Sequence, residues 1–413
     1  MKKVLVPRVR FKGFSEEWSK ERLENIYSFA SEGGTPDTNK DIYYKPGLFY
    51  FTKIEDMANK YISHTKAKIS ELGLKNSSAW IIPKNNILFS NGATIGNVSI
   101  NKVDLSTKQG IVGMIIKKKF NLEFIYYLLK SENCQSKVAE KITVGTIPTV
   151  AIFNLKKIEL FLSKNIYEQQ KIGKLLENID NLINLENSKL NKLKQLKETL
   201  LQKMFPDGNS KTPRIRFRGF NEEWKEERLE NITKRMSSGG TPSTTIKKFY
   251  NGKIPFLTIS DMTKVGKYIN NTEKNITPEA IENSSTWLVP KNSLLLSMYA
   301  SFGKTAINKK EITTSQAILG IILNNNISVE FLYYLLFLMD INKYWYKQVE
   351  TGTQPNLSNW TVSKTLIKLT KNISEQQKIG DFFCKIDTLI NLYNSKLNKL
   401  KQIKEGLLQK MFV

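Results

Sequence analysis

Histidine, cysteine and long apolar runs are scarce in this chain of 413 residues. The single histidine, His64, lies in the polar stretch YISHTKAK, so chemistry that requires a histidine pair is not expected. The two cysteines, Cys134 and Cys384, describe neither a disulfide framework nor a zinc site, and we expect both to be reduced core residues. These residue types therefore predict no metal site in the chain.

The apolar runs are too short for a membrane protein. The run FLYYLLFLM at 331–339 is about half as long as the roughly 18 residues that a membrane span needs. The opening MKKVLVPRVR is interrupted at Pro7, which leaves too short an apolar stretch for a signal peptide. We therefore expect a cytoplasmic protein without membrane association.

Basic residues, by contrast, are abundant. The chain has 63 Lys and Arg against 38 Asp and Glu, a formal net charge of +25. Such an excess favours a polyanionic partner, because lysine and arginine neutralise phosphates and release condensed counterions. A lysine-rich composition without a specific partner is the alternative.

The sequence repeats itself. PRVRFKGFSEEWSKERLENI at 7–26 returns as PRIRFRGFNEEWKEERLENI at 213–232, and SKLNKLKQLKETLLQKMF at 188–205 returns as SKLNKLKQIKEGLLQKMF at 395–412. Between these segments the halves share only landmarks, such as GGTP at 33–36 and 239–242. The chain is therefore a tandem repeat with a shared framework and divergent interiors.

Each interior has the pattern of a compact α/β domain. IPFLTIS, NSLLLS and AILGIIL are typical of strands, whereas LEFIYYLLKSENCQSKVAEKI and VEFLYYLLFLMDINKYW are typical of helices. We place the first domain at 1–165 and the second at 206–371. Helical spacers follow them at 166–205 and 372–413.

Both spacers carry apolar residues three and four positions apart, a heptad pattern that requires a partner helix. In the first spacer, Glu186 and Lys197 interrupt the pattern. An amphipathic helix lying on its own domain is the alternative, although 38 residues would make a helix of about 57 Å. The helical-spacer residues expected to bind a partner are Ile172, Leu176, Ile179, Ile183, Leu190, Leu193, Leu200, Ile379, Phe383, Ile386, Ile390, Leu397, Leu400 and Leu407.

The two spacers can pair with each other. The first spacer leads from the first domain to the second, so an antiparallel second spacer must return the C-terminus to the first domain. The expected fold is α+β: two similar α/β domains joined by two long antiparallel helices in a coiled-coil spacer, with a cyclic pseudo-two-fold repeat.

The usual catalytic motifs are missing from the sequence. MYASFGKT at 298–305 lacks the first glycine of a phosphate-binding loop, and neither Asn-Pro-Pro-Tyr nor Asp-Pro-Pro-Tyr of adenine methyltransferases occurs. Asp207, Glu223 and Lys225 imitate the spacing of metal-dependent nucleases, but the first repeat has Ser19 in place of the lysine. Two alternatives stay open: a non-catalytic scaffold with two binding domains, and a free-standing metal-dependent nuclease.

SSGGTPS with IPFLTISDM, EQQKIG at the start of each spacer and LLQKMF at its end occur in an order that resembles the specificity subunit of type I restriction-modification enzymes. The resemblance covers the whole chain. It implies that each interior is a target recognition domain for one half of a split DNA site, and that the spacers set the half-site separation and dock two methyltransferase subunits. It further implies that S-adenosylmethionine is bound by those subunits, and ATP and Mg by a restriction subunit, with no cofactor in this chain.

Candidate DNA-binding residues lie where glycine beside small hydroxyls allows the backbone to approach phosphate, and in loops that differ between the halves. A purely structural turn is the alternative for the glycines. The candidates are Gly34, Thr35, Lys40, Ser90, Asn91, Lys108, Gln109, Thr146, Gly240, Thr241, Lys247, Ser297, Tyr299, Gln316, Thr353, Gln354 and Asn356.

Overall fold

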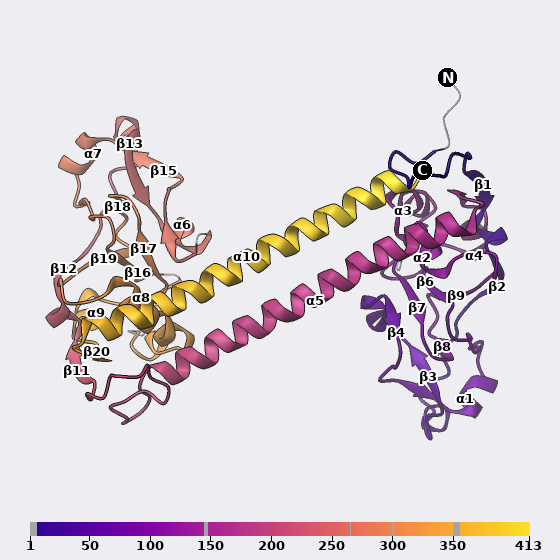
Figure 1. The fold of residues 1–413 in the computed structure, drawn as a ribbon, viewed down its shortest axis with the longest axis horizontal. Helices are drawn as coiled ribbons and strands as arrows, with labels where there is room; N and C mark the ends of the chain where they lie inside the picture. The colour runs from indigo at the N-terminus through magenta and orange to yellow at the C-terminus, as the bar shows by residue number, and fades with distance from the viewer. Residues whose placement is uncertain (1–5, 144–147, 265, 300, 350–355) are drawn as a thin grey trace. The chain divides into compact units, whose positions relative to one another are not determined.

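The computed structural model describes residues 6–143, 148–264, 266–299, 301–349 and 356–413. The chain divides into two compact units, an N-terminal unit of residues 1–187 and 395–413 and a C-terminal unit of residues 188–394 (Figure 1). Each unit thus contains part of both long helices. We call the part of a unit outside these helices its body.

The elements of the two units follow the same order along the chain. In the N-terminal unit they are β1 (Ser19–Arg22), η1 (Leu23–Asn25), β2 (Tyr27–Glu32), η2 (Asp41–Tyr43), β3 (Phe49–Thr52), η3 (Ile54–Ala58), β4 (Tyr61–Ile62), β5 (Lys68–Ile69), α1 (Glu71–Lys75), β6 (Ile87–Ser90), β7 (Val98–Asn101), β8 (Leu105–Thr107), β9 (Ile111–Ile116), α2 (Leu122–Lys130), α3 (Glu132–Ala139), α4 (Ile152–Lys156), β10 (Glu159–Leu162) and the start of α5 (Ile166–Met204). In the C-terminal unit they are β11 (Lys225–Arg228), η4 (Leu229–Ile232), β12 (Thr233–Ser238), η5 (Lys247–Phe249), β13 (Tyr250–Leu257), α6 (Ile259–Lys264), β14 (Tyr268–Ile269), β15 (Lys274–Ile276), α7 (Pro278–Glu282), β16 (Leu294–Ser297), β17 (Thr305–Asn308), β18 (Thr313–Thr314), β19 (Ile318–Leu323), α8 (Val329–Ile341), η6 (Trp345–Lys347), α9 (Asn359–Lys364), β20 (Leu366–Leu369) and the start of α10 (Ile373–Met411).

The sheets of the two bodies have the same topology. A five-stranded sheet has the order β2-β9-β6-β7-β4 in the N-terminal unit and β12-β19-β16-β17-β14 in the C-terminal unit. A three-stranded sheet, β5-β3-β8 or β15-β13-β18, and a two-stranded sheet, β1-β10 or β11-β20, complete each body. The predicted fold of two repeated α/β domains is therefore confirmed.

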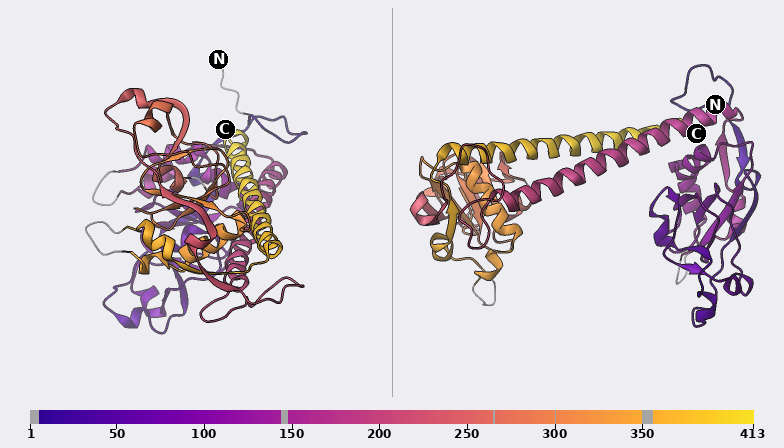
Figure 2. Two further views of the ribbon diagram at one scale, coloured as in Figure 1. Left: turned by 90° about the vertical axis from the view of Figure 1, so that its left-hand side faces the viewer. Right: turned by 60° about the horizontal axis from the view of Figure 1, so that its bottom comes forward.

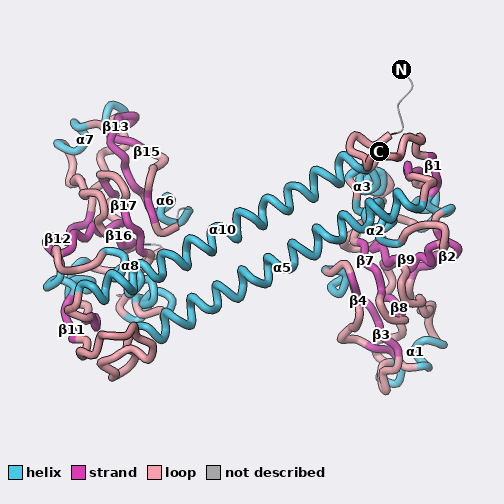
Figure 3. Tube along the Cα trace, in the orientation of Figure 1, coloured by secondary structure: helices cyan, strands magenta, loops and turns pink. Residues whose placement is uncertain are grey.

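Central strands arise from short apolar runs. All four residues of β6 and all four of β16 are buried, as expected for strands covered on both faces. In the N-terminal unit, α2 lies between the five-stranded sheet and α5 (Figure 3). One face of each large sheet is thus covered by helices.

Several boundaries differ from the prediction: the helix expected over 329–345 ends at Ile341, and a side-chain cap explains two further differences. The strand expected over IPFLTIS ends at Leu257, because the Asp261 carboxylate accepts the Thr258 backbone N–H at 2.9 Å and caps α6. The helix expected over 122–142 is divided at Ser131, whose hydroxyl accepts the Cys134 backbone N–H at 3.3 Å and starts α3. In both places a local side-chain cap outweighs the apolar pattern.

The spacers are single helices of 39 residues each. The Asn165 side chain caps the start of α5 by accepting the Tyr167 N–H at 2.9 Å, and Asn372 accepts the Ser374 N–H of α10 at 3.0 Å. Helix α5 ends just before Pro206, which lacks the N–H that continuation needs.

The helices are antiparallel within each unit (Figure 2). In the N-terminal unit, the ammonium of Lys404 on α10 lies 2.5 Å from the carboxylate of Asp180 on α5, and the ammonium of Lys396 lies 3.0 Å from the carboxylate of Glu186. In the C-terminal unit, Lys197 of α5 lies 2.5 Å from Asp387 of α10. The two charged residues that interrupt the heptad pattern, Glu186 and Lys197, are therefore accommodated by ion pairs.

The C-terminus returns to the first domain, as predicted. Phe412 is only 6% exposed, and its ring centroid lies 5.4 Å from that of Phe124 and 6.1 Å from that of Trp18. Phe205 makes the equivalent contacts with Phe331 and Trp224 in the C-terminal unit. The repeat is thus cyclic in structure.

Most of the predicted spacer residues face inward. Ile172 and Leu176 are core residues of the N-terminal unit, and Ile379, Phe383 and Ile386 are core residues of the C-terminal unit. The remaining predicted residues are buried (Ile179, Leu190, Leu397) or half-buried (Ile183, Leu193, Leu200, Ile390, Leu400, Leu407). None of the described helices combines enough length with enough apolar character to cross a membrane.

Candidate nucleic-acid interface

Three loops of the N-terminal body are joined by backbone hydrogen bonds. The Asn91 N–H, just after β6, donates to the Gly110 carbonyl at 3.0 Å, and the Val150 N–H donates to the Asn91 carbonyl at 2.8 Å. An isolated bridge also pairs Gly92 with Thr149. Segments far apart in the sequence therefore form one continuous loop surface.

The C-terminal body has the same arrangement with other side chains. The Met298 N–H donates to the Ala317 carbonyl at 2.9 Å, and the Leu357 N–H donates to the Met298 carbonyl at 2.9 Å. Tyr299 pairs with Asn356 in an isolated bridge. The two loop surfaces therefore share a backbone framework but display different residues.

Several predicted DNA-binding residues form hydrogen bonds within these loops. The Ser90 hydroxyl donates to the Thr94 carbonyl at 2.5 Å and accepts the Asn97 N–H at 2.8 Å, and Ser297 makes the equivalent bonds. Both serines are fully buried, and the nearly buried Asn91 amide donates to the Val150 carbonyl at 3.1 Å. These side chains fix the loop conformation, and DNA contact by them stays a prediction.

The glycines of the two GGTP segments are also buried. A Cβ atom at Gly34 would lie 2.2 Å from Ser78 Oγ, and one at Gly240 would lie 2.2 Å from Ser285 Oγ. Close packing inside each body therefore accounts for glycine at these positions. Phosphate contact by their backbone is untested.

The other described candidates are placed on the surface. Thr35, Lys108, Gln109 and Tyr299 are exposed, and Asn356 is half-buried. Exposed Gln316 is joined to the GGTP segment, because its amide oxygen accepts the hydroxyl of Thr241.

Lys40 and Lys247 lie apart from the loop hydrogen bonds. Both are exposed, and the Lys40 ammonium nitrogen lies 5.4 Å from the centroid of the Tyr43 ring. Among the residues with a described position, no hydrogen bond or ion pair joins either lysine to the loop surface. The candidates Thr146, Thr353 and Gln354 fall outside the described residues.

An exposed aromatic residue beside each loop surface was missed from the sequence. Phe153 on α4 is 64% exposed and Trp360 on α9 is 71% exposed, and the two occupy equivalent positions in the repeat. Lys157 lies 3.7 Å from the centroid of the Phe153 ring. The shared aromatic character was visible in the sequence, but its exposure was not.

The nuclease-like spacing does not assemble a site. Asp207 forms an ion pair with Arg214 at 2.7 Å, whereas Glu223 forms one with Lys211 at 3.1 Å, so each carboxylate is paired with a different basic residue. In the part of the chain with described positions, no group of three or more His, Cys, Asp or Glu side chains could hold a metal ion. This arrangement does not favour the nuclease alternative.

Two repeated bodies with unlike loop surfaces define a protein with two similar but distinct binding domains. The chain belongs to the family of the type I restriction modification DNA specificity domain, which matches residues 15–195 and again residues 221–402. The two matches correspond to the two repeats.

The chain is similar in sequence to specificity subunits of type I restriction enzymes. The chain is 32% identical over 193 residues to the type I restriction enzyme MjaIX specificity subunit of Methanocaldococcus jannaschii, covering 46% of this chain and 44% of that protein. It is 30% identical over 174 residues to the EcoR124I/EcoR124II specificity subunit of Escherichia coli, covering 41% and 42%. The aligned part thus spans less than half the length of either relative.

Solved structures share the fold along nearly the whole chain. The crystal structure of a type I restriction-modification system S subunit from M. genitalium superposes with a TM-score of 0.62 at 18% identity, covering 99% of each chain. A chain from a study of complex assembly and conformational transition of the type I R-M system superposes with a TM-score of 0.58 at 16% identity, covering 95% of this chain and 97% of that one. At sequence identities of 18% and 16%, these similarities show a shared fold and nothing further.

Proposed function

We propose that this chain is the DNA sequence-specificity subunit of a type I restriction-modification complex, and that each unit recognises one half of a bipartite DNA site. The observation that carries the proposal is the pair of loop surfaces with one backbone framework and different side chains. Asn91 and Gly92 in one unit are matched by Met298 and Tyr299 in the other. Different side chains on a common framework are suited to different base sequences.

The charge of the chain supports DNA as the ligand. A formal charge of +25 provides the sequence-independent attraction to phosphate on which specific recognition is built. Exposed Lys108 within the N-terminal loop surface and Lys304 beside the C-terminal one are suited to phosphate contacts. Phe153 and Trp360 add aromatic surface next to the same loops.

Catalysis belongs to partner subunits in this proposal. The chain contributes no catalytic group and no cofactor of its own. Methyltransferase subunits bind S-adenosylmethionine and modify adenine, and a restriction subunit uses ATP and Mg. The complex acts on DNA in the cytoplasm.

The outer face of the helices offers two equivalent docking surfaces. Six leucine or isoleucine side chains of α5 and α10 are 46–60% exposed. They form three equivalent pairs in the repeat: Leu182 with Leu389, Leu185 with Leu392, and Leu196 with Ile403. Two equal surfaces suit two copies of one partner, so we assign them to two methyltransferase subunits, with the helices setting the half-site separation.

Reconstitution tests the proposed function. The purified chain alone is expected to bind DNA in a salt-dependent manner without modifying it. With methyltransferase subunits and S-adenosylmethionine it is expected to direct adenine methylation to a two-part sequence. Methylation or metal-dependent cleavage by the chain alone would contradict the proposal, and DNA binding that is independent of salt would favour a protein scaffold.

The docking surfaces are tested by charge substitution. Leu185→Glu and Leu392→Glu are each expected to remove one methyltransferase subunit, and the double variant both, because a carboxylate is costly in an apolar interface. The stoichiometry is measured by light scattering after size-exclusion chromatography. Leu48→Glu is the matched control, because Leu48 is 60% exposed but lies in a body. Full stoichiometry in the double variant would contradict this assignment of the surfaces.

A further inference from the structure

A cluster of lysine, tyrosine and acid side chains joins the body of the N-terminal unit to its helices. The Lys60 ammonium donates to the Tyr127 hydroxyl at 3.2 Å and lies 3.6 Å from the carboxylate of Glu177 on α5. That carboxylate also accepts the Tyr61 hydroxyl at 2.5 Å. The Tyr127 hydroxyl donates to Asp180 at 2.6 Å. Each buried donor in this cluster therefore has an acceptor, and Lys60 has an acidic partner.

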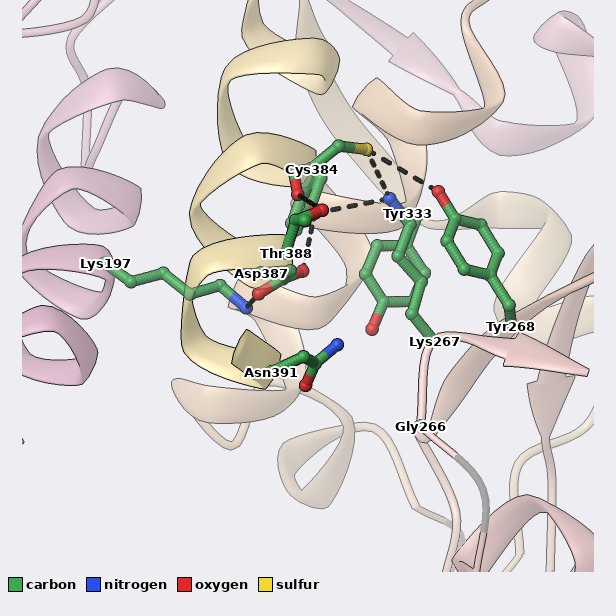
Figure 4. Close-up of a pocket in the computed structure, with 10 residues that line it drawn as sticks. Lys197, Gly266, Lys267, Tyr268, Tyr333, Cys384, Asp387, Thr388 and Asn391 are labelled. Atoms are coloured by element: carbon green, nitrogen blue, oxygen red, sulfur yellow. Dashed lines mark hydrogen bonds and ion pairs between the residues drawn. The ribbon is translucent and has the colours of Figure 1, made fainter. Parts of the chain in front are cut away.

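The C-terminal unit repeats this cluster with one substitution. The Lys267 ammonium donates to the Tyr334 hydroxyl at 3.2 Å, and the Tyr334 hydroxyl donates to Asp387 at 2.6 Å. Where α5 has Glu177, α10 has Cys384, whose sulfur lies 2.9 Å from the Lys267 nitrogen and 3.6 Å from the Tyr268 oxygen (Figure 4). The shorter cysteine side chain has no carboxylate to offer either donor.

The substitution leaves an unbalanced positive charge in a pocket of about 430 Å³. Three charged side chains line this pocket: Lys197, Lys267 and Asp387. Asp387 is already engaged by Lys197 at 2.5 Å and by the Tyr334 hydroxyl. Among the residues with described positions, Lys267 has no acidic side chain within ion-pair distance.

The surroundings of Lys267 make this charge accessible but poorly solvated. Burial lowers the pKa of the Lys267 ammonium, whereas its contact with Cys384 and the more distant carboxylates of Glu330 and Asp387 oppose that shift. The rings of Tyr268, Tyr333 and Tyr334 lie within 4.9 Å of its nitrogen and stabilise the cation. Asp381, at the position of Lys174, is exposed and does not line the pocket. A negatively charged ligand would give Lys267 the acidic partner that Lys60 has in Glu177.

We propose that this pocket of the C-terminal unit binds a small carboxylate, whose oxygens accept hydrogen bonds from Lys267 and Tyr268 as the Glu177 carboxylate does from Lys60 and Tyr61. A monoanion matches the single unbalanced charge of the lining, whereas a phosphate dianion would be repelled by Asp387. The walls formed by Tyr268 and Tyr333 suit a short apolar group attached to the carboxylate.

The test uses acetate as the probe and the full chain without DNA or partners. Sodium acetate is expected to raise the melting temperature in a saturable manner relative to sodium chloride at equal ionic strength. It is also expected to slow the reaction of Cys384 with N-ethylmaleimide several-fold. Cys134, the other cysteine, is fully buried and serves as the internal control. Equal melting temperatures in the two salts would overturn the proposal.

The repeat supplies matched variants. Cys384→Glu introduces the side chain of the other unit, so it is expected to raise the melting temperature and to abolish the acetate effect. Glu177→Cys is expected to create a second acetate site in the N-terminal unit. If Cys384→Glu does not fold, Lys267→Gln must abolish the acetate effect instead. An acetate effect that persists in folded Cys384→Glu or Lys267→Gln would contradict the assignment.

Discussion

The carboxylate of Asp180 on α5 lies 2.5 Å from the ammonium of Lys404 on α10, and the repeat exchanges these roles in the C-terminal unit. There, Lys197 of α5 lies 2.5 Å from Asp387 of α10. Each helix carries an aspartate in its first half and a lysine in its second half, so it can pair with an antiparallel copy of itself. This self-complementarity explains why the chain contains nearly the same helical sequence twice.

Asp387→Asn is expected to destabilise the C-terminal unit by about 2 kcal/mol, because it leaves the partly buried Lys197 ammonium without its counter-charge. Hydrogen exchange resolved by unit measures the loss. Asp41→Asn is the control, since the Asp41–Lys45 pair is exposed and should contribute less than about 1 kcal/mol. Equal losses in the two variants would show that burial of the ion pair is unimportant.

Trp18→Phe is expected to lower the free energy of unfolding by about 1–2 kcal/mol more than Trp224→Phe does. Both rings are buried, but only the Trp18 N–H donates to a carboxylate, that of Glu168 at 3.2 Å, while the Trp224 N–H has no hydrogen-bond partner among the described residues. Denaturant unfolding of each variant, followed by unit-resolved hydrogen exchange, measures the difference. A larger loss from Trp224→Phe would contradict the expectation.

Phe412→Ala is expected to destabilise the N-terminal unit by about 3–5 kcal/mol, because the ring fills the core between Trp18 and Phe124. The C-terminal unit should keep its protection in hydrogen exchange. Ile403→Ala, on the exposed face of the same helix, should change either unit by less than about 1 kcal/mol. Destabilisation confined to the C-terminal unit would refute the structural return of the C-terminus.

Asp340→Asn is expected to stabilise the protein at neutral pH. Burial raises the pKa of the Asp340 carboxyl, with Lys304 opposing, and the residue lies near the end of α8, where a negative charge is unfavourable. A folded-state pKa above the unfolded value adds stability at low pH that is lost as the pH rises through the folded pKa. The gain in stability of the Asp340→Asn variant over the unchanged protein should therefore grow from acid to neutral pH. A pH-independent difference in melting temperature would argue against this cause.

The long helices and the repeat were predictable from sequence because periodicity and internal identity are properties of the chain alone. The α2–α3 break at Ser131 was missed because a single hydroxyl cap outweighs the apolar pattern. The loops around Asn91 and Gly110 were identified as candidates because they differ between halves, but their union depends on backbone pairing that no spacing reveals. For the same reason the sequence could not show that Ser90 and Gly34 face inward, or that Cys384 faces Lys267.

The most direct test of the account is a map of methylated adenines in cells that carry this chain with its methyltransferase subunits. Replacing residues 27–160 by the matching domain of a relative is expected to change one half of the methylated sequence and to leave the other half and the separation unchanged. A change in both halves, or an unchanged site, would contradict the claim that each unit recognises its own half of the DNA sequence.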